Sequence, residues 1–112
     1  MGAESLTRIA AALLLLCGVA VAVAAPVAPA PERAAQLRHL ARQDCGACHG
    51  LSLRGGLGSP LTPEALKDKP DAGLAAVILA GRPGTPMPPW RPFLTEEEAI
   101  WLVYWLKQGA PP

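Results

Sequence analysis

The sequence lacks an excess of charge of either sign. Ten Lys and Arg residues against nine Asp and Glu residues give a formal net charge of +1 at pH 7. A protein that binds nucleic acid is expected to carry a strongly basic surface, so nucleic acid is not an expected partner. The sequence also lacks the alternation of apolar and polar residues that indicates a β-strand, and it has no internal repeat. These absences point to a small helical protein with other partners.

The chain has little material for a core once its first residues are set aside. Residues 1–8 form a short polar head, and residues 9–25 form an uncharged apolar run that ends in small residues. This arrangement is typical of a secretory signal peptide, so we predict that residues 1–25 direct export to the periplasm. The alternative is an uncleaved membrane anchor through residues 9–25, although this run falls short of the roughly 20 residues that span a bilayer.

The predicted folded domain is residues 32–112, because residues 26–31 contain only proline, alanine and valine and are predicted to form a linker. A domain this short buries little apolar surface by itself. Disulfides cannot make up the difference, since Cys17 lies in the predicted signal and a disulfide between Cys45 and Cys48 would close a very small loop. We therefore expect a covalently held, buried cofactor to complete the core.

The first predicted helix runs from Glu32 to about Cys45. Its apolar residues recur at intervals of three and four, with charged residues on the other face; they are Ala34, Leu37, Leu40 and Ala41. Glycines then interrupt the helix and predict a loop; they are Gly50, Gly55, Gly56 and Gly58.

Later in the chain, capping residues mark three more helices. Residues 62–64, Thr-Pro-Glu, open a short helix that ends at Leu66. Asp71 is predicted to cap a helix that ends before Gly81. Thr95 and Glu98 have the spacing of a capping box, which predicts a last helix from there to Gly109. The predicted fold class is all-α, with three to four helices.

One short motif carries chemistry. Cys45, Cys48 and His49 form a Cys-x-x-Cys-His run, which is the signature of c-type haem attachment. Cysteines three apart on a helical turn project their sulfurs to one side, where both can bond to the same ring. His49 can then offer Nε2 to the haem iron while its other ring nitrogen donates to a carbonyl. We predict one covalent haem c held by these residues.

Two other interpretations use the same residues. A thioredoxin-like dithiol also has Cys-x-x-Cys, but it is expected near a βαβ pattern, and this sequence has no strand pattern. Zinc bound by Cys45, Cys48, His49 and His39 is the second alternative. Adjacent Cys48 and His49 are poor joint ligands in a tetrahedral site, and a second ligand pair at the usual spacing is missing.

Met87 is the predicted sixth ligand of the iron. It lies in residues 82–90, where four prolines exclude a helix and predict a stiff loop. A stiff loop suits a weak thioether ligand, because the prolines restrict the chain before the bond from Met87 to the iron forms as well as after. The alternative is a methionine that only fills the core. His39 is predicted to be a partly exposed surface residue.

This ligation predicts an electron carrier and not an enzyme. Soft sulfur stabilises ferrous iron, and six ligands in both oxidation states leave no position open for a substrate. The large aromatic residues are predicted to line the haem ring and to fill the core around it; they are Trp90, Trp101, Tyr104 and Trp105. Two alternatives remain, both of which need Met87 to dissociate: a weak peroxidase, and a module that binds carbon monoxide or nitric oxide.

With these motifs the chain resembles class I cytochromes c, in which the first and last helices cross beside the haem. The resemblance implies that the carbonyl of Pro60 accepts a hydrogen bond from Nδ1 of His49. The chain is more closely similar to NirC-type cytochromes, which are encoded with dissimilatory nitrite reductase. That similarity covers Asp44 to Leu106 and rests on DCGACHGLSLRGGLGSPLTPEAL, ILAGRPGTPMPPW and FLTEEEAIWLVYWL. Ser59 departs from the glycine expected before the proline.

The resemblance implies partners in denitrification. It predicts a monomeric periplasmic carrier that takes electrons from a quinol-linked donor and passes them to the haem d nitrite reductase, or that serves in haem d maturation. Membrane contact is expected only if the signal stays uncleaved.

The charges suggest where such partners dock. Arg54, Arg82 and Arg91 are expected to form a positive rim at the haem edge, with Glu96, Glu97 and Glu98 farther off. Pairing of Arg82 and Arg91 with the haem propionates is the alternative.

Overall fold

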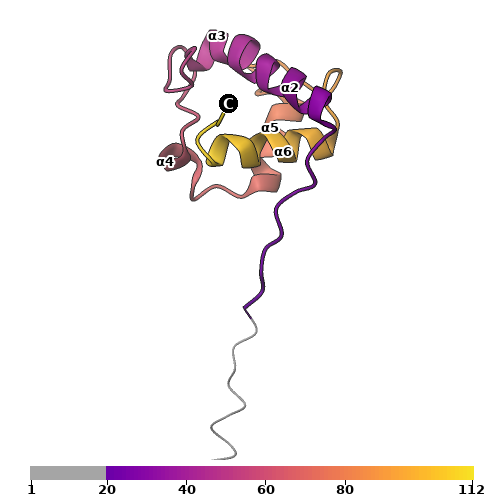
Figure 1. Cartoon of the computed structure of the whole chain (residues 1–112). Coiled ribbons are helices and arrows are strands. Elements are labelled where there is room, and N and C mark those ends of the chain that lie inside the picture. Colours follow the sequence, from indigo (N-terminus) through magenta and orange to yellow (C-terminus); the bar gives the residue numbers. More distant parts are fainter. Residues whose placement is uncertain (1–19) are drawn as a thin grey trace, which may run out of the picture.

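The computed structural model describes residues 20–112. Most of the predicted signal, residues 1–19, lies outside this part of the chain. Residues 20–30 form no helix or strand, are mostly exposed, and extend away from the folded part of the molecule (Figure 1). Between residues 20 and 112 the structure contains helices and no strand, so the prediction of an all-α fold is confirmed. No helix in this range is long and apolar enough to cross a bilayer.

Residues 31–49 form one helical stretch on one side of the molecule (Figure 1). It comprises helix α2 (Pro31–Leu40), a π-helical turn η2 (Ala41–Cys45) and helix α3 (Gly46–His49). The helix begins at Pro31, one residue before the predicted start, because the fixed φ of proline suits the first turn, where its missing N–H is not needed. The prediction of a helix through this region is confirmed.

The end of this stretch differs from the prediction. Residues 41–45 make the wider π turn, in which the N–H of Gly46 donates to the carbonyl of Ala41, five residues back. The helix then continues past Cys45 to His49 and stops at Gly50, whose φ of 87° is a left-handed value that glycine adopts readily. All three residues of the Cys-x-x-Cys-His motif are therefore helical.

Helix α4 (Pro63–Leu66) has the predicted bounds and the predicted cap, since Thr62 Oγ1 accepts from the N–H of Ala65 at 3.4 Å. Helix α5 (Asp71–Ala80) ends at Gly81 as predicted, with φ of 68°. The predicted cap of α5 is wrong. Pro70 occupies the cap position and Asp71 is the first helical residue, because its carboxylate instead binds Lys107 of the last helix.

Helix α6 (Glu96–Lys107) begins with the predicted capping box. The N–H of Glu98 donates to Thr95 Oγ1 at 3.2 Å, and the N–H of Thr95 donates to Glu98 Oε2 at 3.1 Å. The helix ends at Lys107, two residues before the predicted end, and the chain then turns at Gly109, with φ of 88°.

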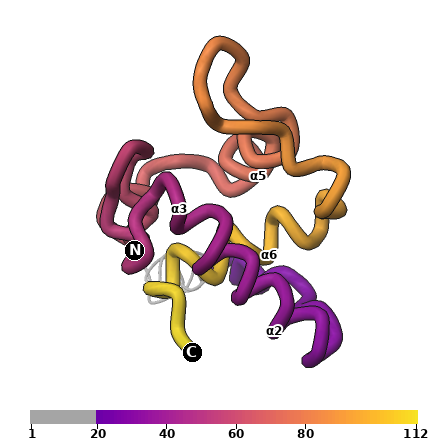
Figure 2. Tube along the Cα trace, turned by 90° about the horizontal axis from the view of Figure 1, so that it is seen from above, coloured from indigo at the N-terminus to yellow at the C-terminus, as the bar shows by residue number. Residues whose placement is uncertain are grey.

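The core forms where α5 and the first helical stretch meet α6 (Figure 2). Half of the residues of α6 are buried, and they include Trp101 and Trp105, whose rings stack with centroids 6.5 Å apart. Trp90 is partly buried against the same cluster. The prediction that the tryptophans contribute to the core is confirmed.

Candidate haem-attachment site

Cys45, Cys48 and His49 lie at the end of the first helical stretch, and all three are half-buried. Cys45 is the last residue of the π turn, and Cys48 and His49 belong to α3. Among the described residues neither thiol is in a disulfide. Two half-buried thiols on successive turns of one helix are arranged as attachment to a single ring requires.

The Cys45 thiol is unsuited to thiolate chemistry. Burial, together with the neighbouring Asp44 carboxylate, raises the pKa of Cys45 to about 11. Little thiolate is then present at neutral pH, whereas dithiol oxidoreductases depend on a lowered pKa. His39 is exposed, and residues 20–112 contain no group of three or more His, Cys, Asp or Glu side chains placed to hold a metal ion. The dithiol and zinc interpretations therefore gain no support.

The imidazole of His49 is held by a backbone carbonyl. Its Nδ1 lies 2.6 Å from the carbonyl oxygen of Ser59. The prediction that the carbonyl of Pro60 accepts this hydrogen bond is wrong. The acceptor is the carbonyl of the preceding residue, Ser59, because the loop turns that peptide toward the ring. A proton on Nδ1 donates to this oxygen and leaves Nε2 unprotonated, as a nitrogen that binds iron must be.

The glycine-rich loop packs closely on the histidine turn. A Cβ on Gly58 would lie 2.8 Å from both Cε1 and Nδ1 of His49, and a Cβ on Gly56 would lie 2.8 Å from the carbonyl oxygen of Cys48. The N–H of Gly58 donates to that carbonyl, and the N–H of Gly55 donates to the carbonyl of His49, each at 2.7 Å. These bonds satisfy the last carbonyls of α3, so the loop is fixed in place.

These observations fit a haem c. The ring of His49 is oriented, the Cys45 thiol is neutral, and only glycine leaves room for the loop backbone beside the ring of His49. Cys45 and Cys48 match the attachment motif, and the residues around them hold the histidine without occupying its Nε2.

Met87 lies in the loop between α5 and α6, which projects from the rest of the molecule in Figure 2. The N–H of Arg82 donates to the carbonyl of Met87 at 3.1 Å and closes the loop. A Cβ on Gly81 would lie 2.6 Å from the backbone of Pro88, so the two ends of the loop are in contact. The loop is irregular, as predicted, and Met87 is half-buried. Its role as an iron ligand stays a prediction.

The charged residues are arranged differently from the expectation. Arg91 lies 3.6 Å from the Glu96 carboxylate, and both side chains are mostly exposed. Glu98 binds Arg33 of the first helix at 2.6 Å. For Arg91 and Glu96 the expectation that the glutamates lie away from the arginine rim is wrong, because the loop after Met87 returns Arg91 to the start of α6.

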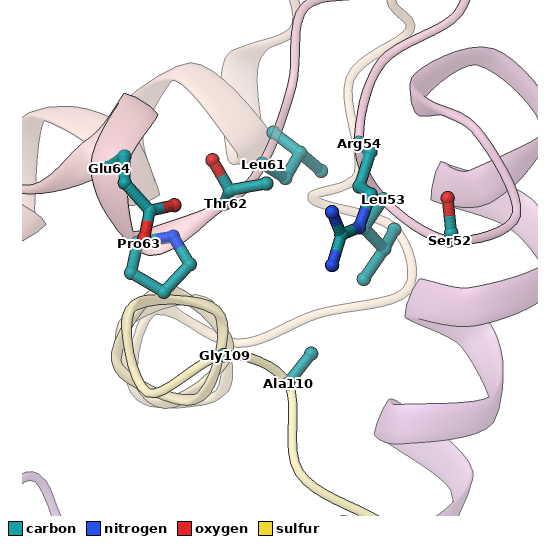
Figure 3. Close-up of a pocket in the computed structure, with 9 residues that line it drawn as sticks. All are labelled: Ser52, Leu53, Arg54, Leu61, Thr62, Pro63, Glu64, Gly109 and Ala110. Atoms are coloured by element: carbon teal, nitrogen blue, oxygen red, sulfur yellow. The ribbon is translucent and has the colours of Figure 1, made fainter.

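Arg54 lies elsewhere, at a hollow of about 370 Å³ beside the glycine-rich loop. Figure 3 shows its side chain across the hollow from Glu64 of α4. The hollow is also lined by the chain end around Gly109 and Ala110, and Cys45, Cys48 and Met87 are not among its lining residues.

A second contact near the motif has no signal in the local sequence. Arg42, in the π turn, lies 5.0 Å over the ring of Trp105 and donates to the carbonyls of Ala110 and Pro111. Trp105 Nε1 donates to the same Pro111 carbonyl at 2.9 Å. These contacts tie the turn that carries Cys45 to the last helix across more than 60 residues of sequence, which no pattern of spacing predicts.

Comparison with known proteins places the chain in a family. Residues 32–106 match the family model described as cytochrome C oxidase, cbb3-type, subunit III. The chain is 60% identical over 81 residues to cytochrome c55X of Pseudomonas aeruginosa, which covers 72% of this chain and 68% of that protein. The solved structure of the c-type cytochrome NirC superposes with a TM-score of 0.70 at 59% identity, covering 72% of this chain and 95% of that one.

A larger protein contains a similar stretch. The dihydro-heme d1 dehydrogenase of Pseudomonas aeruginosa is 43% identical over 72 residues, which make up 64% of this chain and 15% of that protein. Together with the attachment motif and its oriented histidine, these matches establish the cofactor and the class of protein. The chain belongs to the family of c-type cytochromes that includes cytochrome c55X and NirC, and it is an electron-transfer protein with one covalently attached haem c.

Proposed function

We propose that this protein is a periplasmic carrier that exchanges single electrons with an enzyme of haem d1 chemistry, either the haem d nitrite reductase or an enzyme that completes haem d1. The similarity to part of the dihydro-heme d1 dehydrogenase carries this proposal. A cytochrome segment inside an enzyme is positioned to exchange electrons with it. A free cytochrome with a similar sequence is then suited to serve such an enzyme as a separate partner.

Four residues would hold the haem. Cys45 and Cys48 would form the thioether bonds, His49 would bind the iron through Nε2, and Met87 would supply the sixth ligand. The bound haem provides an iron that takes up and releases one electron. The hydrogen bond from His49 Nδ1 to the carbonyl of Ser59 supports this assignment, because it leaves Nε2 unprotonated.

The protein's part in electron transfer is to hold His49 and Met87 in the same positions while the electron moves. The loop bonds from Gly55 and Gly58 to the end of α3 hold the histidine side. On the other side, the closed turn between Arg82 and Met87 limits the positions that the methionine can take. With both sides held, and with His49 and Met87 as the two residues that would bind the iron, the site would suit a carrier better than an enzyme.

Absorption spectra and anaerobic stopped-flow mixing test this proposal. The protein is purified from a periplasmic fraction, and its reduced form is mixed with oxidised haem d nitrite reductase. Its oxidised form is mixed with dihydro-heme d1 dehydrogenase and substrate. We expect low-spin haem c spectra and second-order electron exchange with at least one enzyme. Exchange with neither, or a high-spin spectrum that binds carbon monoxide at once, would contradict the proposal.

A further inference from the structure

We propose that the glycine-rich loop, residues 50–60, is the surface on which the redox partner docks, with Leu51 and Leu57 as its apolar contacts and Arg54 as its charged contact. This inference rests on the proposed function, since it requires a partner protein. The partner that fits is a protein surface with an apolar patch and a carboxylate beside it.

The first observation is the exposure of the two leucines. Leu51 is 74% exposed and Leu57 is 81% exposed, whereas Leu53 between them is buried in the core. Phe93 is the other exposed large apolar side chain of the folded domain. Each leucine directly follows a glycine, and a Cβ on Gly56 would lie 3.3 Å from the backbone nitrogen of Gly50, so the loop backbone brings the two leucines near each other. Exposed apolar side chains that gather on one surface mark interaction sites.

The second observation is how close these residues lie to the attachment turn. A Cβ on Gly46, between the two cysteines, would lie 3.4 Å from the Cα of Leu51, so Leu51 sits directly on this turn. Leu57 stands between Gly56 and Gly58, whose backbones pack on Cys48 and on the ring of His49. A protein that covers the leucines is therefore separated from the haem attachment by little more than one layer of backbone.

The third observation is charge. In residues 20–112 the ion pairs involve Arg33, Arg91 and Lys107, and Arg54 forms none. Arg54 is exposed, lies between the two leucines in the sequence, and lines the same hollow as Glu64 without forming an ion pair with it. Arg91, by contrast, already faces Glu96. A carboxylate on the partner would therefore find in Arg54 a charge that no residue in the described part of this chain already pairs.

The rigidity of the loop favours docking. The N–H of Gly55 donates to the carbonyl of His49, and the N–H of Gly58 donates to the carbonyl of Cys48. A further hydrogen bond runs from the N–H of Leu61 to the carbonyl of Leu53. The leucines are thus presented by a loop that loses little conformational freedom when a partner covers them. Redox encounters bury less surface than stable complexes do, so a small contact surface of this kind suits an electron-transfer partner.

Phe93 supplies a matched control. It is 62% exposed, and its carbonyl accepts from Arg33 at the start of the first helix. Arg33 is 16 residues before His49, which corresponds to about 24 Å along a helix. A polar substitution at Phe93 removes a similar apolar side chain from a different part of the surface.

The experiment compares the double variant Leu51→Ser/Leu57→Ser with Phe93→Ser and wild type. We measure the second-order rate of electron exchange with the enzyme that reacts with wild type, the reduction potential and the haem spectrum. We expect the double variant to react about tenfold more slowly with an unchanged potential and spectrum, and Phe93→Ser to react at the wild-type rate. Arg54→Gln should slow the reaction at low ionic strength and match wild type at high ionic strength.

Two results would overturn the inference. The first is a double variant that reacts at the wild-type rate, which would place docking elsewhere. The second is a shifted potential or altered spectrum in the double variant, which would make the leucines part of the haem wall. A wild-type protein that reacts with neither enzyme would instead refute the proposed function, and the docking proposal would fall with it.

Discussion

The imidazole Nδ1 of His49 lies 2.6 Å from the carbonyl oxygen of Ser59, ten residues later in the chain. This contact determines which ring nitrogen carries the proton, and so which nitrogen is free to bind iron. It depends on the close packing of the loop on the ring, where Gly58 leaves no room for a side chain. The first prediction tests this packing.

Gly58→Ala should disturb the histidine. The added Cβ would lie 2.8 Å from two ring atoms of His49, so the ring or the loop must move. We expect a lower melting temperature and a shifted reduction potential, measured by thermal unfolding and potentiometry. Gly73→Ala is the control, because a Cβ at this position of α5 would meet nothing within 4 Å beyond its chain neighbours and the backbone of its own helix. It should be neutral or stabilise the protein by up to about 1 kcal/mol. Equal behaviour of the two variants would contradict the role given to Gly58.

Cys48→Ala should yield little or no holoprotein. A domain this small is expected to need the haem to complete its core, so loss of one attachment should impair folding as well as binding. His49→Ala should prevent a stable low-spin haem. Haem staining of denaturing gels reports covalent attachment, and circular dichroism reports folding. A Cys48→Ala protein that is free of haem and melts cooperatively would argue against this dependence.

Met87→His should lower the reduction potential substantially. Imidazole favours ferric iron more than a thioether does, so the oxidised state gains stability. Potentiometry measures the shift. Oxidised wild type should also show the weak far-red band of methionine-bound ferric haem. If this band is missing from wild type, or persists in the variant, then Met87 is not the ligand.

Glu98→Gln should destabilise the protein in a pH-dependent way. The hydrogen bond from Arg33, together with the bond from Thr95, holds the pKa of Glu98 below its ordinary value of 4.5, although burial opposes this. The stabilisation is therefore full above pH 4.5 and is lost as the pH falls through the lowered pKa of the folded state. We expect the variant to be less stable at pH 7 by about 1 kcal/mol.

Denaturant unfolding of wild type and Glu98→Gln across pH 2–7 checks this prediction. The two curves should converge at the acid end, where the wild-type carboxyl is protonated as well. Glu97→Gln, in the same turn of α6, is the control for the loss of one negative charge. A difference between wild type and Glu98→Gln that does not change with pH would contradict the assignment to Arg33.

Arg42→Leu should destabilise the protein without removing a haem ligand. The change loses the contact over Trp105 and two hydrogen bonds to the carbonyls of Ala110 and Pro111. These losses amount to about 1–3 kcal/mol in the free energy of unfolding, measured with denaturant. Arg38→Leu, one turn earlier in α2, should cost much less. An equal loss in both variants would mean that the effect comes from the helix and not from the Trp105 contact.

The helices were predictable because their signals are local. Thr95 and Glu98 are three residues apart, so the capping box is complete within one turn, and Gly81 ends its helix through its own backbone. The position of Asp71 was not predictable in the same way, and the cap predicted there is absent from α5. Its carboxylate is bound by Lys107, 36 residues away, and only the packing of α5 on α6 brings the two together.

The sequence by itself determined that the protein carries a haem c, because the attachment motif needs only Cys45, Cys48 and His49 on one turn of helix. It also determined the all-α class, since periodicity and capping act over a few residues. Only the tertiary structure decided that Ser59 holds the histidine, that Arg91 faces Glu96, and that Leu51 and Leu57 stay exposed. These relationships depend on how loops fold back on helices, and such long-range contacts leave no regular spacing in the chain.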